Sequence, residues 1–121
     1  MLDGQVPFRT ESPVTDTAVL ATGLEDLAAQ HPVREGRVAP HRLYDGDGVR
    51  IRHLAFDAGA ELTEHVAPKT IVVTVPEGRV RFTVEGEAHV LSAGAVLVVA
   101  AGVPHAVLAH EPSRLLITFV G

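Results

Sequence analysis

The chain has 121 residues, which is enough for one domain with a single hydrophobic core and leaves little room for a second. It contains no cysteine, so disulfides, thiolate catalysis and cysteine-based zinc or iron–sulfur sites are excluded. The net charge is -5 at pH 7 and Lys69 is the only lysine, so the basic patch typical of nucleic-acid-binding proteins is missing. No apolar stretch has the length of a membrane span, and the first residues lack the features of a signal peptide. We therefore expect a cytoplasmic protein that binds neither nucleic acid nor membrane.

The first part of the chain predicts an irregular arm with one short helix. Residues 1–22 contain two prolines and no sustained hydrophobic period. Thr22 and Glu25 then fit a capping box, and apolar residues at helical spacing follow, which predicts a helix over 23–30. Pro32 is the expected stop. We assign residues 1–36 to this arm and expect its helix to lie on the main body as a lid or strap.

From residue 37 to 121 the pattern predicts an all-β domain. Short stretches of alternating or β-branched residues are separated by glycine-rich turns, such as Asp45-Gly46-Asp47-Gly48 and Glu85-Gly86. The expected strands include 49–56, 70–75, 79–84, 89–91, 96–99, 105–108 and 115–120. Many short strands at regular spacing indicate a sandwich or a barrel.

The spacing of glycines and histidines makes the chain resemble the cupin family. Gly59, His65 and Gly78 match one cupin motif, while Gly94, Gly102 and His105 match the other. The resemblance covers about residues 40–120 and is to the small single-domain cupins of type 2, the conserved-barrel family. It implies a double-sheet jelly-roll barrel, also called a double-stranded β-helix, over residues 37–121.

The same resemblance implies a metal site, and this sequence departs from it at two of four ligand positions. Cupins usually hold a metal with three histidines and one glutamate, but only His65 and His105 are present here. Ala67 and Ile71 occupy the other two positions, and neither alkyl side chain can ligate a metal. Two imidazoles fall short of the three protein ligands typical of catalytic zinc. The metal motif is therefore degenerate.

Strand parity offers a third candidate ligand. His53 alternates with Val49, Ile51 and Ala55, which we interpret as the barrel-facing side of their strand. His65 and His105 with His53 as a third ligand would form a three-histidine site suited to Zn, Ni, Fe, Mn or Cu, and a protein without any metal is the alternative. A buried histidine bound by hydrogen bonds is the more common role for such a residue. His31, His41 and His110 are expected at the surface, and Arg50 and Arg52 on the outer sheet face or at a dimer contact.

The expected pocket is small and apolar and is centred on the histidines. Its residues are His53, His65, Ile71, Val73, His105 and Val107, with Val75 and Val98 lining or packing nearby. Two functions remain open. The first is a metal-dependent enzyme of dioxygenase, isomerase or cyclase type that acts on a small organic molecule. The second is a non-catalytic module that binds or senses a small molecule and has lost the metal. The sequence does not identify catalytic residues or the substrate.

A homodimer is the expected assembly. Cupins commonly pair through their sheets, and the apolar segment Leu115–Val120 would be prone to aggregation as an exposed edge strand. Residues 1–30 could alternatively cover that edge or exchange with a second copy.

Overall fold

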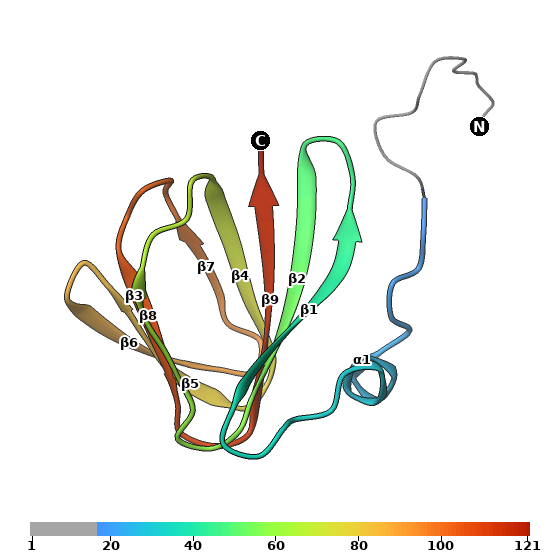
Figure 1. Cartoon of the computed structure of the whole chain (residues 1–121), viewed down its shortest axis with the longest axis horizontal. Coiled ribbons are helices and arrows are strands. Elements are labelled where there is room, and N and C mark those ends of the chain that lie inside the picture. Colours follow the sequence, from blue (N-terminus) through green and yellow to red (C-terminus); the bar gives the residue numbers. More distant parts are fainter. Residues whose placement is uncertain (1–16) are drawn as a thin grey trace.

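A computed structural model describes residues 17–121, in which nine strands form a two-layered barrel and one short helix lies outside it (Figure 1). The elements are α1 (Leu24–Gln30), β1 (Val38–Asp45), β2 (Val49–Phe56), β3 (Glu61–His65), β4 (Thr70–Glu77), β5 (Arg79–Val84), β6 (Glu87–Ser92), β7 (Val96–Val99), β8 (His105–Ala109) and β9 (Ser113–Val120). No helix in the described part of the chain is both long and apolar enough to cross a membrane.

The strands form two antiparallel sheets that face each other across the core. Sheet A has the order β1-β2-β9-β4-β7, and sheet B has the order β3-β8-β5-β6. Figure 1 shows the two sheets diverging toward the end where the chain terminates and where β2 begins. We call this wider end the mouth of the barrel. The hydrophobic core lies between the sheets, with Phe56 and Phe82 among its largest fully buried side chains.

The register places the inward-facing residues of sheet A in rows across the strands. The row nearest the mouth consists of Arg50, Phe119, Ile71 and Val99, and the next consists of Arg52, Ile117, Val73 and Leu97. On sheet B, the row nearest the mouth contains His65, His105 and Val84. The loop that joins β3 to β4 places His65 and Thr70 at the same end, so these rows face each other across the mouth.

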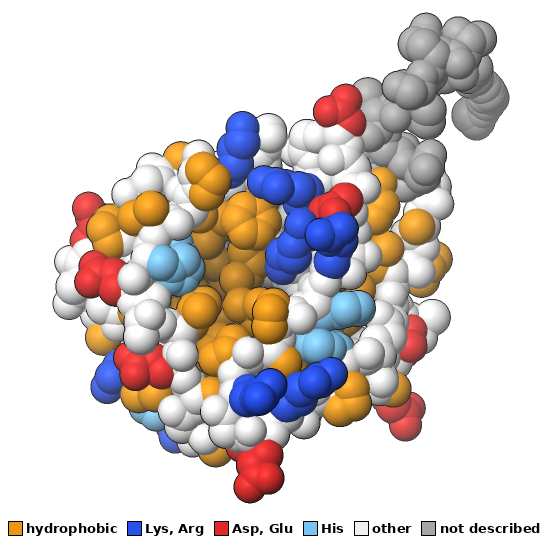
Figure 2. Space-filling model, viewed as in Figure 1, with side chains coloured by type: hydrophobic (Ala, Val, Ile, Leu, Met, Phe, Trp, Pro, Cys, Tyr) orange, Lys and Arg blue, Asp and Glu red, His pale blue; other side chains and the backbone are white. Residues whose placement is uncertain are grey.

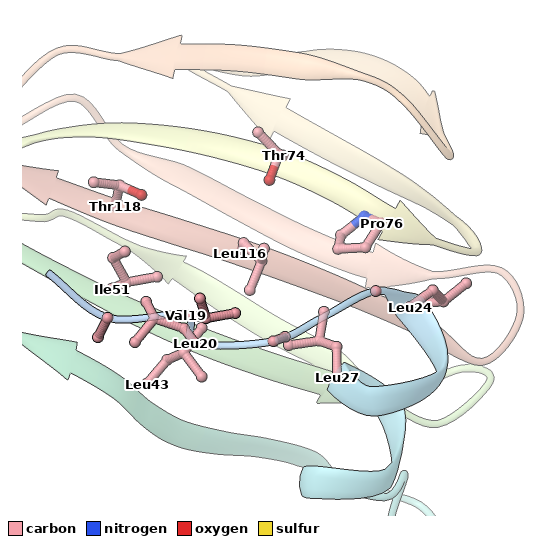
Figure 3. Close-up of a pocket in the computed structure, with 13 residues that line it drawn as sticks. Val19, Leu20, Leu24, Leu27, Leu43, Ile51, Thr74, Pro76, Leu116 and Thr118 are labelled. Atoms are coloured by element: carbon pink, nitrogen blue, oxygen red, sulfur yellow. The ribbon is translucent and has the colours of Figure 1, made fainter.

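The helix lies outside the barrel, where residues 18–27 cover the part of the outer face of sheet A formed by β1, β2 and the neighbouring half of β9. Leu20, Leu24 and Leu27 line an apolar groove against Ile51 and Leu116 of the sheet (Figure 3). We call residues 18–31 the strap. The predicted helix is confirmed, but the predicted capping box is wrong. Gly23 is the N-cap and makes no side-chain cap; instead, the side chain of Asp26 accepts hydrogen bonds from the backbone N–H and the hydroxyl of Thr22.

Two strand predictions need correction. The segment 61–65 is not among the predicted strands but forms β3, with a register shift between Leu62 and His65. The C-terminal strand β9 is not an edge, because it lies between β2 and β4. The edges of sheet A are β1 and β7, so an exposed C-terminal edge cannot be the reason for dimerisation. Residues 1–30 were the segment proposed to cover the C-terminal edge. Residues 1–16 lie outside the described part of the chain, and residues 18–27 cover an outer face of sheet A instead of an edge.

Gly78 is the turn glycine at which a side chain would clash most severely with the backbone. Its φ is 96°, and a Cβ there would lie 2.6 Å from both the carbonyl oxygen of Pro112 and the Cα of Ser113. Ser113 is itself fully buried, and its hydroxyl accepts a hydrogen bond from the Arg79 N–H. A methyl group at position 78 must therefore displace backbone.

We expect Gly78→Ala to destabilise the protein far more than Gly59→Ala. Both glycines have positive φ, but a Cβ on Gly59 would meet nothing within 4 Å. Gly59→Ala should cost only the conformational penalty of about 1–2 kcal/mol. Gly78→Ala should cost roughly 2 kcal/mol more, because overpacking adds to the strain. Urea unfolding of the two variants measures the difference, and equal midpoints would contradict this account.

Candidate functional site at the mouth of the barrel

The structure brings His65 and His105 together at the mouth. They are register partners on β3 and β8, and their ring centroids lie 4.3 Å apart in an edge-to-face arrangement. His105 is buried and its ring stacks on Phe82 at 5.8 Å, while His65 is exposed. Burial lowers the pKa of His105, so this imidazole is neutral at pH 7.

Both imidazoles are held in the same tautomer by backbone carbonyls. Nδ1 of His65 donates to the carbonyl oxygen of Thr63 at 2.8 Å, and Nδ1 of His105 donates to that of Val103 at 2.9 Å. A carbonyl only accepts, so each neutral ring carries its proton on Nδ1 and a lone pair on Nε2. Neither Nε2 has a hydrogen-bond partner among residues 17–121. The pair therefore offers two acceptors to a ligand.

The site lacks the donors for a complete family-type metal centre. The tautomers of His65 and His105 suit metal ligation, because Nδ1 is bound by a carbonyl and Nε2 is free. However, the buried residues at the other two ligand positions, Ala67 and Ile71, are alkyl. Within the described part of the chain, no three His, Asp or Glu residues are grouped so that they could hold a metal ion. The residues present do not fit a three-ligand metal.

The structure does not bring His53 to this pair, and the predicted parity of β2 is wrong. Leu54 and Phe56 belong to the core between the sheets, so the alternate residues Ile51 and His53 face outward. The Nε2 atom of His53 accepts a hydrogen bond from Nη1 of Arg114 at 3.2 Å. The side chain of His53 therefore does not face the interior of the barrel, and it is not free to act as a third ligand. Parity failed because the strap covers the outer face, so its residues are apolar, while the inner face carries two arginines near the mouth.

His53 instead belongs to a buried cluster beneath the end of the strap. Its ring lies 5.5 Å from that of His31 and 6.3 Å from that of His41, and His31 stacks on His41 at 4.9 Å. Arg114 also donates to the carbonyl oxygen of His31 and pairs with Glu77 at 3.0 Å. This single guanidinium thus joins the strap to sheet A. His31 and His41, expected at the surface, are partly buried, whereas His110 is exposed as predicted.

Sequence reasoning also misplaced Arg50 and Arg52, which lie on the inner face of β2. The Arg50 guanidinium stacks over the Phe119 ring, 5.3 Å from its centroid. Arg52 is held by Asp45, with 2.8 Å between Nη1 and Oδ1. Their alternation with the core residues Leu54 and Phe56 was the available signal, but the outward residues of β2 are equally apolar. In the view of Figure 2, hydrophobic side chains lie in a hollow of the molecular surface, with a cluster of Lys and Arg side chains beside it and His side chains on both sides.

The remaining predicted pocket residues lie deeper. Ile71, Val73, Val75 and Val107 are all buried in the core between the sheets. Val98 is 62% exposed on the outer face, so its expected role as a lining or packing residue is wrong. A hollow of about 130 Å³ beside His105 is lined in part by Glu64 and Glu85. Thr83 and Ala106 also line this hollow, and they alternate with the inward-facing residues of β5 and β8, so the hollow lies on the outer side of sheet B and not in the mouth.

Comparison with known proteins agrees with this architecture. A family model for the cupin domain matches residues 52–120, which is more than half of the chain. The chain belongs to the cupin family. The predicted all-β cupin barrel with a short N-terminal helix is thereby confirmed.

Solved structures share the cupin fold with this chain. A conserved protein of unknown function from Streptococcus pyogenes is 23% identical with a TM-score of 0.73, over 93% of this chain and 96% of that one. A cupin superfamily protein from Desulfitobacterium hafniense is 23% identical with a TM-score of 0.72, over 78% and 86%. An RmlC-like cupin from Shewanella frigidimarina is 28% identical with a TM-score of 0.66, over 70% and 77%. A search of curated proteins found no match.

The burial of His53 predicts that the protein loses stability in mild acid. Burial, and then the positive charge of Arg114, lower the pKa of His53 to about 4. An unfolded histidine has a pKa near 6.5, so between these values the unfolded chain binds a proton that the folded chain does not. This contribution to the free energy of unfolding is fully present above about pH 6.5. It is lost as the pH falls toward about 4, by on the order of 3 kcal/mol.

His53→Gln should flatten this pH dependence, because an amide oxygen can still accept from Arg114 but does not titrate. Urea unfolding from about pH 7 to about pH 4.5 measures the slope. His110→Gln, which removes an exposed histidine, is the matched control and should keep the wild-type slope. An unchanged slope in His53→Gln would contradict the assignment to His53.

Proposed function

We propose that this cupin binds a small organic molecule in the mouth of its barrel, with the Nε2 atoms of His65 and His105 as its hydrogen-bond acceptors. The observation that carries the proposal is the fixed tautomer of both rings, which leaves two lone pairs without a protein partner. Around them, the lining is apolar, with Phe82 against His105 and Phe119 on the opposite sheet. An apolar cavity with a few oriented polar groups is the usual form of a small-molecule site.

Thermal stability in the presence of ligands tests this proposal. At about ten times its Kd, a bound ligand adds about 1.4 kcal/mol and should raise the Tm by roughly 5 °C. We expect single-ring compounds that carry an O–H or N–H donor to produce this shift in the wild type and to lose it in His65→Ala and His105→Ala. His110→Ala is the matched control. If a broad library of such compounds shifts no Tm, the binding proposal is wrong.

A metal-dependent enzyme of dioxygenase, isomerase or cyclase type is the second candidate function. The tautomers of His65 and His105 favour it, and the missing donors at Ala67 and Ile71 weigh against it. Elemental analysis of purified protein distinguishes the two candidates. We expect the wild type to contain far less than one equivalent of Fe, Mn, Ni, Cu or Zn after incubation with each. The double variant Ala67→His/Ile71→Glu, which restores the family's donors, should gain metal. One equivalent in the wild type, lost in His65→Ala, would instead support the enzyme.

We also propose that the protein acts in the cytoplasm as a homodimer, joined through the outer face of sheet A. The outward residues of β4, β7 and β9 over Thr70–Thr74, Val96–Val98 and Leu116–Val120 are uncharged. Among them, Val96 is 67% and Val98 62% exposed. A contiguous exposed apolar patch of this kind is typical of an interaction surface. A two-fold dimer needs only one such self-complementary face.

Introducing charged residues on the outer face of sheet A should convert the dimer to a monomer. We expect light scattering to give a dimeric mass for the wild type and a monomeric mass for Val96→Glu/Val98→Glu, since paired carboxylates would be desolvated in the interface. Val90→Glu, on the exposed side of β6 in sheet B, is the matched control and should remain dimeric. A monomeric wild type at micromolar concentration would contradict the proposal.

A further inference from the structure

The two walls of the mouth differ in the kind of group that they offer to a ligand. On sheet A, the row Arg50–Phe119–Ile71–Val99 presents a cation and an aromatic ring. On sheet B, the facing row presents the acceptors of His65 and His105. A ligand between the walls therefore meets a positive charge at one end and lone pairs at the other.

Arg50 is the cation that remains free to bind. Asp45 is the carboxylate at this corner, and it pairs with Arg42 at 3.2 Å and with Arg52 at 2.8 Å. Among the described residues, no carboxylate lies within ion-pair distance of Arg50. Its guanidinium plane is instead supported by the Phe119 ring. Three guanidinium groups thus surround one carboxylate, and the excess positive charge lies at Arg50, which projects from the inner face of β2.

The histidine wall is suited to the opposite end of the ligand. Nδ1 of His105 donates to the carbonyl oxygen of Val103, so its Nε2 presents a lone pair that accepts a hydrogen bond and does not attract an anion. A hydroxyl or amine donor is therefore favoured at this wall, and a carboxylate is favoured at Arg50.

The separation of the walls limits the size of the ligand. Packed sheets lie about 10 Å apart, and side chains from both walls reach into that space. One planar ring with a polar group at each end fits between them, and Phe119 supplies an aromatic face on the sheet A side, whereas Phe82 is fully buried behind His105.

We propose that the ligand is a small hydroxy-substituted organic acid of about one ring, with its carboxylate on Arg50 and its hydroxyl donating to the histidine pair. This rests on the proposed function and specifies the ligand of the same site. Arg50 is then the residue that selects an acid over its neutral analogue, and His65 and His105 select the hydroxyl.

Four probes that differ by one group at a time test both ends of this arrangement. Calorimetry or NMR titration compares 4-hydroxybenzoate, benzoate, 4-hydroxybenzamide and benzamide, with 3-hydroxybenzoate as a positional check. We expect the wild type to bind 4- or 3-hydroxybenzoate most tightly. Arg50→Gln should weaken binding of the acids by about 10-fold or more, because it removes a charge-assisted hydrogen bond, and should leave the amides within about two-fold. His65→Ala should make hydroxybenzoate bind no better than benzoate.

Arg81→Gln, an exposed arginine on the outer side of β5, is the matched control and should change nothing. If the amides bind as tightly as the acids and Arg50→Gln has no effect, the acid assignment is overturned while binding in the barrel stands. If no probe binds at about 10 mM, the hydroxy-acid class is overturned. The broader library under Proposed function then decides whether the mouth binds any small molecule.

Discussion

Burial of one part of sheet A on both faces is the constraint on which the arrangement of this molecule depends. Its inner face packs on sheet B, and the strap covers its outer face over β1, β2 and the neighbouring half of β9. Because a strand buried on both sides has no polar face, polar residues within it must find partners where they are. Arg114 and His53 do so with each other, and Arg114 also binds the strap carbonyl of His31 and the side chain of Glu77. The strap and the sheet therefore depend on each other, since leaving that guanidinium unpaired would be costly.

The sequence was informative where backbone geometry restricts the choice of residue. Turn glycines such as Gly78 and Gly94 have positive φ, so their spacing revealed the strands and the family. The same spacing located His65 and His105. Parity failed on β2, because the strap makes the outer face apolar while arginines occupy the inner face near the mouth. On β3 strict alternation does not hold, because the register shift between Leu62 and His65 puts residues three apart on one face. The parity error on β2 is also the reason that the sequence did not place Arg50 in the mouth.

Loss of two metal ligands changes what the remaining histidines can do. Ile71 lies in the same inner row as Arg50 and Phe119, so an alkyl group now occupies a place where the family has a carboxylate. That replacement removes a negative charge that would otherwise compete for Arg50. The backbone hydrogen bonds to Nδ1 of His65 and His105 remain, and they keep both Nε2 lone pairs available. Without these two ligands, the histidine pair is suited to a hydrogen-bond donor.

His53 lies on the outer side of sheet A, whereas His65 and His105 lie on the inner side of sheet B, so the responses of the two groups to pH are separable. His53 is bound to Arg114 through Nε2 and titrates as part of the connection between strap and sheet. His105 has its Nε2 free and its pKa lowered chiefly by burial, so protonation there would replace an acceptor with a donor. Acid would thus weaken binding of a hydroxyl at the mouth through His105 and weaken the fold through His53. Because the residues do not touch each other, a substitution at either one leaves the other's titration in place, and the two effects can be assigned to their own residues.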